Sequence, residues 1–181
     1  KFNILVIGGS QGAKIFSDVV PKAVSLLPRK IKKNLHIFHQ VRKEDEIKVK
    51  NFYDKNKINY NLKYFFNDIE KYYKISHLVI SRSGSSSIFE IAAAGRPSII
   101  VPLKSSLDNH QYKNAEFMMK NNAVFCIEEE KFDSFFLKEN IEKLISNRGL
   151  LISLSKNVRK QFVKNSPQLI SDLAKNELGI S

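Results

Sequence analysis

The sequence has 181 residues, of which 43% are hydrophobic, and a formal net charge of +12. This length suffices for one well-buried domain but is small for two. No apolar run approaches the ~20 residues that span a bilayer. The single cysteine, Cys126, excludes an intramolecular disulfide framework, and no Cys/His spacing suggests a zinc site. We therefore expect one globular domain in a reducing, cytosolic setting.

The strong positive charge could favour binding of nucleic acid, anionic lipid or a phosphorylated ligand. The lysines are scattered along amphipathic segments rather than gathered in one arm, and Lys, Asn, Ile and Phe are abundant throughout. This indicates a general compositional bias, so the charge alone selects no partner.

Short apolar runs alternate with helical patterns along the chain. This alternation predicts an α/β fold, a doubly wound parallel sheet of six strands flanked by helices, in a single domain over residues 1–181. The expected strands are 2–7, 34–39, 60–65, 77–81, 98–101 and 123–127. One helix is expected to end near residue 27, a second to follow residue 40, and a third to end near residue 74. Further helices are expected over 86–94, 110–121, 131–146, 149–164 and 167–177.

Residues 77–102, HLVISRSGSSSIFEIAAAGRPSIIVP, are expected to form strand, tight turn, helix and strand. Ser85, Ser86 and Ser87 stand where the helix begins. The first amides of a helix have no internal partner and favour an anion, and serine hydroxyls add donors. Glu90, further along, could accept hydrogen bonds from a vicinal diol such as a ribose. An alternative of equal weight is that the serines only cap the helix and Glu90 is an exposed helix residue.

A glycine-rich loop, GGSQGA over residues 8–13, follows the first strand. Glycines at this place let the backbone turn sharply and let a ligand approach the amides. The loop is neither GxGxxG nor a P-loop, so it is a phosphate-type loop of another kind or simply a tight turn. In doubly wound sheets ligands bind at the carboxyl ends of the strands. Both turns lie at such ends, which favours a binding role.

The motifs ILVIGGSQGA, HQ at 39–40, RSGSSSIFEIAAAGRPSIIVP and DNHQYKNA at 108–115 resemble the MurG family of glycosyltransferases, in order and in spacing. Members of that family have the GT-B fold and transfer N-acetylglucosamine from UDP-GlcNAc to lipid I, which gives lipid II for peptidoglycan. The resemblance covers nearly the whole chain but only the carboxyl-terminal, nucleotide-sugar half of the family. It implies that the amino-terminal acceptor domain is absent from this chain.

The resemblance implies one UDP-GlcNAc site assembled from several turns, with no catalytic residue, metal or cofactor in this half. The glycine-rich loop and the serine turn would meet the diphosphate, an aromatic residue the uracil, a glutamate the ribose, and a polar loop the sugar. In that order the implied residues are Ser10, Gln11 and Gly12; Gly84, Ser85, Ser86 and Ser87; Phe66; Glu90; and Asp108, His110 and Gln111.

Two departures from the family pattern concern this site. The family usually has two adjacent glutamines in the sugar loop, and here the first is His110. Three serines replace a more apolar stretch, which should keep the backbone donors. Arg82 is expected to support the turn rather than the ligand. The implied chemistry is displacement at the anomeric carbon, with helix amides and hydroxyls rather than a metal stabilising the leaving UDP.

The implied partners are UDP-GlcNAc, lipid I through the absent domain, and the cytoplasmic face of the bacterial plasma membrane, on which the whole enzyme would be peripheral. Nucleic acid is not an implied partner. A UDP-sugar glycosyltransferase of the same fold with another acceptor, or a non-catalytic nucleotide-binding module, remains an alternative. A basic nucleic-acid binder would use the charge without needing Glu90.

Overall fold

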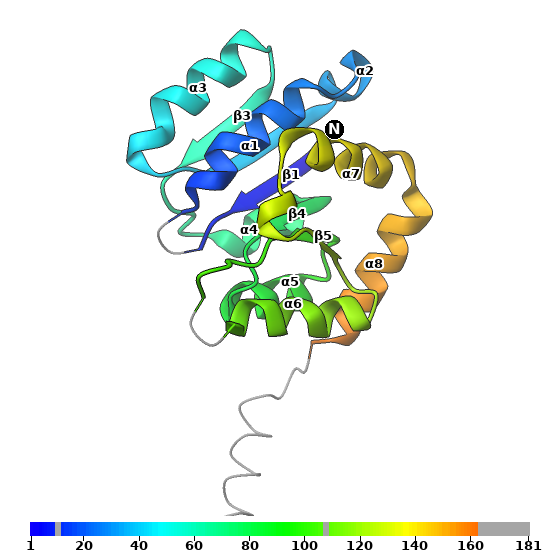
Figure 1. Cartoon of the computed structure of the whole chain (residues 1–181). Coiled ribbons are helices and arrows are strands. Elements are labelled where there is room, and N and C mark those ends of the chain that lie inside the picture. Colours follow the sequence, from blue (N-terminus) through cyan, green and yellow to red (C-terminus); the bar gives the residue numbers. More distant parts are fainter. Residues whose placement is uncertain (10–11, 107–108, 163–181) are drawn as a thin grey trace, which may run out of the picture.

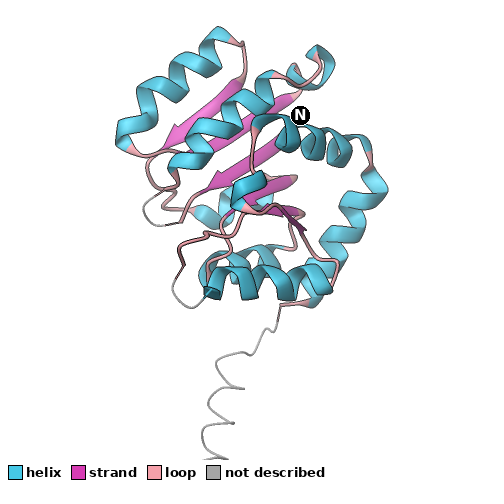
Figure 2. Ribbon diagram, in the orientation of Figure 1, coloured by secondary structure: helices cyan, strands magenta, loops and turns pink. Residues whose placement is uncertain are grey.

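The computed structural model describes residues 1–9, 12–106 and 109–162. Six strands in these ranges form one parallel sheet in the order β3-β2-β1-β4-β5-β6 (Figures 1 and 2). The strand order reverses between β1 and β4, as in a doubly wound fold. The expected six-stranded α/β architecture is therefore confirmed. The strands are β1 (Phe2–Ile7), β2 (Leu35–Gln40), β3 (Asn59–Lys63), β4 (Leu78–Ser81), β5 (Ser98–Ile100) and β6 (Phe125–Cys126).

Helices connect successive strands and cover both faces of the sheet (Figure 1). They are α1 (Lys14–Ser25), α2 (Arg29–Lys32), α3 (Glu46–Lys55), α4 (Ile69–Ile75), α5 (Ser85–Ala94), α6 (His110–Lys120), α7 (Ser134–Ser146) and α8 (Arg148–Lys160), with 3-10 turns η1 (Lys43–Asp45) and η3 (Glu129–Lys131).

Most element boundaries lie within a few residues of those expected, with informative exceptions. The last strand, expected over 123–127, pairs only over Phe125–Cys126. The helix expected from residue 131 begins at Ser134, after the η3 turn. The short helix α2 was not expected. The helix expected over 167–177 lies outside the described residues.

The core consists of two clusters, one on each face of the sheet. Ile4 and Val6 of β1 pack with residues of α1, α3 and α7, whereas Leu5 and Ile7 pack with residues of α4, α5 and α6. Successive side chains of a strand point to opposite faces, so a strand buried on both sides needs an unbroken apolar run. This explains why β1 and β4 read as continuous apolar stretches.

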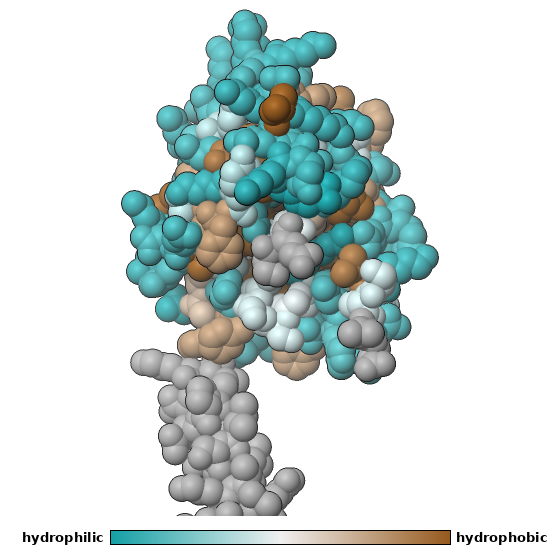
Figure 3. Space-filling model, turned by 90° about the vertical axis from the view of Figure 1, so that its left-hand side faces the viewer, coloured by the Kyte–Doolittle hydropathy of each residue, from teal (hydrophilic) through white to brown (hydrophobic). Residues whose placement is uncertain are grey.

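The carboxyl ends of β1 and β4 lead directly into the glycine-rich loop and the serine turn. These two strands are neighbours, with Ile7 opposite Ser81 in the register. The amino ends of α1 and α5 therefore lie at the same edge of the sheet. Figure 3 faces this side of the molecule: its upper part is mostly hydrophilic, and paler and brown residues gather in its middle and lower part. Among the described helices, none is long and apolar enough to cross a membrane.

Candidate functional site

Two adjoining cavities lie at this edge of the sheet, with volumes of about 370 and 400 Å³. They share Gly9, Gly84 and Ser87. The first, called the aromatic cavity, is lined by Ile7, Gly9, Gln40, Phe65, Phe66, Ile69, Gly84, Ser85, Ser86, Ser87 and Glu90. The second, called the glycine cavity, is lined by Gly8, Gly9, Gly12, Ala13, Lys14, Arg82, Gly84, Ser87, Leu103 and Gln111.

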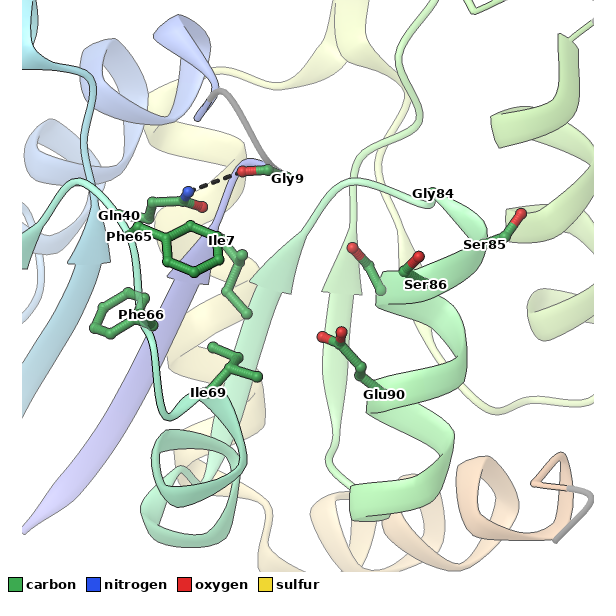
Figure 4. A pocket seen from close by; sticks show the side chains of 11 residues that line it. Ile7, Gly9, Gln40, Phe65, Phe66, Ile69, Gly84, Ser85, Ser86 and Glu90 are labelled. Carbon is green, nitrogen blue, oxygen red and sulfur yellow. Dashed lines mark hydrogen bonds between the residues drawn. The ribbon is translucent and has the colours of Figure 1, made fainter.

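The glycine-rich loop is closed on itself and braced from β2. A Cβ at Gly8 would stand 2.1 Å from the backbone nitrogen of Ala13, so no larger residue fits there. Gly9 and Gly12 have φ of +86° and +71°, which favours glycine. The Gln40 side chain accepts a hydrogen bond from Gly8 N at 3.0 Å and donates one to Gly9 O at 2.8 Å (Figure 4). Gln40 thus holds the loop, a role that the HQ motif alone did not indicate.

Three of the expected site residues, Ser10, Gln11 and Asp108, lie outside the described residues. Their roles stay predictions. Gly12, the third loop residue of the expected set, lines the glycine cavity.

The serine turn places uncapped helix amides at the cavities. Gly84 is the N-cap of α5 and no side chain caps the helix, so the serines that follow do not serve as its cap. The capping interpretation of these serines is therefore wrong. The helix α1 likewise begins after Ala13 without a side-chain cap. Two helix amino ends lie at the glycine cavity, an arrangement that favours an anion, although the third amide of α1, Phe16 N, donates to Ala13 O at 3.0 Å.

The helix α6 braces the serine turn from outside. Ser83 Oγ donates to Gln111 O at 2.7 Å, and Asn114 Nδ2 donates to Ser83 O at 3.0 Å. Ser85 points away from Glu90 in Figure 4, and its Oγ lies 3.5 Å from Asn114 Nδ2. The turn is thus held in place without use of its own amides.

Of the expected sugar-loop residues, the structure brings one to the cavities. Gln111 lines the glycine cavity, and its Oε1 accepts a hydrogen bond from Leu103 N at 3.1 Å. His110 is exposed as the first residue of α6 and lines neither cavity.

Arg82 is buried, with 8% of its surface exposed. Its Nη1 donates to the carbonyls of Val101 and Pro102 at 3.2 Å, and its Nη2 to Glu129 Oε1 at 2.7 Å. The guanidinium also lies over the Phe16 ring. Burial alone would raise the pKa of Glu129, but the hydrogen bond from Arg82 contributes to a pKa below the usual value. These contacts fit the structural role expected for Arg82.

Glu90 projects from α5 toward the side of the aromatic cavity where Ile69 lies (Figure 4). It is half-buried, and its Oε2 accepts a hydrogen bond from Tyr73 Oη at 3.1 Å. Burial, together with the Glu90 charge, raises the pKa of Tyr73, so the phenol remains a donor. The interpretation of Glu90 as a merely exposed helix residue is therefore wrong. Tyr73 holds one carboxylate oxygen and leaves Oε1 for a ligand.

The accessible aromatic ring belongs to Phe65 rather than to Phe66. Phe66 is 3% exposed and packs against Tyr72 with 4.4 Å between ring centroids, whereas Phe65 is 61% exposed. Both residues line the aromatic cavity. The ring expected at the uracil, that of Phe66, is thus buried, whereas the neighbouring ring of Phe65 is exposed at the same cavity. The role of Phe66 stays a prediction.

Within residues 1–9, 12–106 and 109–162, no group of three or more His, Cys, Asp or Glu side chains could hold a metal ion. The donor groups in the lining of the two cavities are backbone amides, serine hydroxyls, the side-chain amides of Gln40 and Gln111, Lys14 and the buried Arg82.

Comparison with known proteins extends these observations. Residues 3–170 match the family described as glycosyltransferase family 28 C-terminal domain. Proteins of Rickettsia bellii and Rickettsia prowazekii, each named UDP-N-acetylglucosamine--N-acetylmuramyl-(pentapeptide) pyrophosphoryl-undecaprenol N-acetylglucosamine transferase, are 40% identical over 173 residues. These matches cover 95% of this chain but 48% and 45% of the relatives. The chain thus spans about half the length of the curated relatives it matches.

A solved structure gives the same correspondence. The crystal structure of Acinetobacter baumannii MurG superimposes with a TM-score of 0.84 and 29% identity, covering 97% of this chain and 52% of that one. The fold and the order of its elements are therefore shared along nearly the whole chain.

Proposed function

We propose that this chain, which belongs to the family of glycosyltransferase family 28 C-terminal domains, binds UDP-N-acetylglucosamine as the donor domain of a hexosyltransferase. That enzyme would transfer N-acetylglucosamine to lipid I and give lipid II for peptidoglycan. One observation carries the proposal: two uncapped helix amino ends and a glycine loop meet beside a cavity that holds an anchored carboxylate and an exposed aromatic ring. The names of the relatives support the same donor and acceptor.

The parts of a UDP-sugar match the two cavities in order. The uracil would lie in the aromatic cavity, with the Phe65 ring against it and the Phe66 backbone at its edge. The ribose would meet Oε1 of Glu90, the oxygen that Tyr73 leaves available. The diphosphate would lie in the glycine cavity, and the sugar would extend toward Gln111.

At the diphosphate, the serine turn from Gly84 to Ser87 and Gly12, with Ser10 and Gln11, would supply donors. Asp108 and His110 belong to the proposed sugar loop. None of these residues is proposed to take or give a proton.

The proposed reaction is displacement at the anomeric carbon of the sugar. The acceptor hydroxyl oxygen would form the new bond as the bond to the diphosphate breaks. The electron pair would leave with UDP, and the hydroxyl proton would pass to a base in the other half of the enzyme. Preorganised amides of α1 and α5 would stabilise the charge that grows on the diphosphate oxygens. We propose that this stabilisation needs no metal. The acceptor site would lie in the other half of an enzyme of the relatives' length, so this chain alone should bind donor without turnover.

An enzyme with a polyprenyl-linked acceptor would work at a membrane surface. We propose a peripheral position on the cytoplasmic face of the bacterial plasma membrane for the whole enzyme, without nucleic acid as a partner. The salt dependence of binding checks the absence of nucleic acid as a partner. Affinity for nucleic acid would fall steeply with salt because binding releases counterions.

Calorimetric titration of the 181-residue chain tests the donor assignment. UDP-GlcNAc should bind more tightly than UDP-GalNAc, UDP-glucose and GDP-mannose. Equal affinity for all UDP-sugars would favour a related transferase or a nucleotide-binding module. No affinity for UDP or for any of these donors would contradict the proposal.

A further inference from the structure

Lys14 occupies an unusual place for a lysine. It is the first residue of α1, its side chain is 63% exposed, and it lines the glycine cavity with Gly12 and Gly84. A helix amino end carries a partial positive charge, so a cation in the first turn is electrostatically unfavourable there. The first turn of α1 has no acidic residue to offset this. The helix dipole therefore gives no reason for a lysine at this position.

The ion pair of Lys14 can open at low cost. Its Nζ lies 2.5 Å from Asp18 Oδ2, and Lys48 Nζ of α3 lies 2.5 Å from the other oxygen, Asp18 Oδ1. Hydrogen bonds from Lys14 and from Lys48 lower the pKa of Asp18. If Lys14 turns away, Lys48 still compensates the Asp18 carboxylate. An exposed ion pair of this kind is in any case worth little.

The other cation at the site is committed elsewhere. Among the described residues that line the two cavities, the basic side chains are Lys14 and Arg82. Arg82 is buried and bonded to two carbonyls and to Glu129. Lys14 is therefore the side chain that can bring a full positive charge to a ligand in the glycine cavity. Helix amides supply only partial charges, and a charge-assisted hydrogen bond to a phosphate is stronger than a neutral one.

We infer that Lys14 is a further donor-binding residue, whose ammonium group leaves Asp18 and contacts the diphosphate of the nucleotide sugar. This inference rests on the proposed function and extends it to a residue outside the loop and turn motifs. In the reaction Lys14 forms no covalent bond and transfers no proton. It offsets negative charge on the departing UDP.

The chain offers a matched control for this inference. Lys14→Gln and Lys48→Gln remove the same charge, and each removes one partner of Asp18, but Lys48 lines neither cavity. Each variant is titrated with UDP, uridine and inorganic pyrophosphate, followed by NMR at low and at physiological salt. Lys14→Gln should bind UDP roughly fivefold more weakly at low salt, with less loss at higher salt. Its uridine affinity should not change, and Lys14→Arg should bind UDP as the parent does.

Lys48→Gln should bind uridine as the parent chain does and should lose much less UDP affinity than Lys14→Gln, because the exposed Asp18 pair that then holds Lys14 is worth little. Its melting temperature should lie close to that of Lys14→Gln. Unchanged UDP affinity in Lys14→Gln would overturn the inference. So would equal weakening in both glutamine variants, because that would reflect overall charge alone. If the parent chain binds neither UDP nor uridine, the proposed function fails. In that case the pyrophosphate titrations test Lys14. If the parent chain and Lys14→Gln bind pyrophosphate with equal affinity, or if neither binds it, this inference is overturned as well.

Discussion

The helices at the cavities and the helices that end the described chain begin in different ways. In α7, Asp133 Oδ1 accepts hydrogen bonds from Phe135 N and Phe136 N at 2.8 and 2.9 Å, and in α8 Asn147 Oδ1 accepts one from Leu150 N at 2.9 Å. No side chain caps α1 or α5. A good N-cap stabilises a helix by about 1 kcal/mol, so the cavity helices give up stability that the other two retain.

The uncapped ends are kept in place by side chains from other elements. Gln40 holds the glycine loop, Asn114 holds the serine turn, and Arg82 ties the end of β4 to the end of β5. The amides themselves stay available. At this edge of the sheet the chain is thus ordered from outside, which leaves the amino ends of α1 and α5 to a ligand, although α3, α4 and α6 also begin without a side-chain cap.

The largest expected effect comes from Gly8→Ala. The new Cβ would stand 2.1 Å from Ala13 N and 2.4 Å from Gly12 C, so the loop must deform. We expect a loss of about 2–3 kcal/mol in unfolding free energy and no measurable UDP binding. Urea unfolding and calorimetry measure the two effects.

Gly84→Ala is the matched control for this change, because a Cβ there meets nothing within 4 Å. Its stability should stay within about 0.5 kcal/mol of the parent. A Gly8→Ala chain as stable and as active in binding as Gly84→Ala would show that the loop tolerates a side chain.

Gly84→Asp should give α5 a side-chain N-cap like the one that Asp133 gives α7. The backbone at Gly84, with φ of −60° and ψ of 149°, accepts any residue, and aspartate is a good N-cap. The carboxylate would occupy the amides and repel the diphosphate, so UDP affinity should fall more than tenfold while the melting temperature holds or rises. Retained UDP affinity in a stable Gly84→Asp chain would mean that the amides of α5 do not meet the diphosphate.

Glu90→Gln should weaken UDP binding by about 2 kcal/mol, the scale of a hydrogen bond to a charged group. Because Tyr73 donates to Oε2 of Glu90, the ribose would contact the other carboxylate oxygen, Oε1. The deoxy ligand 2′-deoxy-UDP should lose less than UDP does, as measured by calorimetry. If both ligands weaken equally, Glu90 does not bind the 2′-hydroxyl; if neither weakens and the melting temperature falls, the glutamate is purely structural.

Asp133→Ala should have the smallest effect and should act on stability alone. Loss of the α7 cap is expected to cost about 1 kcal/mol of unfolding free energy, with UDP affinity unchanged. Chemical denaturation and UDP titration of the same sample provide the measurement. A change in UDP affinity would show that the α7 cap and the helix ends at the cavities are coupled.

The sequence by itself determined the elements and the turns between them. Apolar runs located β1 and β4, the glycine pattern located the loop after β1, and Gly95 with φ of +62° ends α5 where expected. These features depend on residues that are neighbours along the chain, so their periodicity and turn chemistry are visible in the sequence.

The tertiary structure decided which side chains meet. Gln40 contacts Gly8 across 32 positions, and Tyr73 contacts Glu90 across 17, because the strand order sets β1 beside β2 and α4 beside α5. The choice between Phe65 and its neighbour likewise depends on which side of the segment after β3 faces the core. No local period carries this information, since it arises only when distant elements pack together.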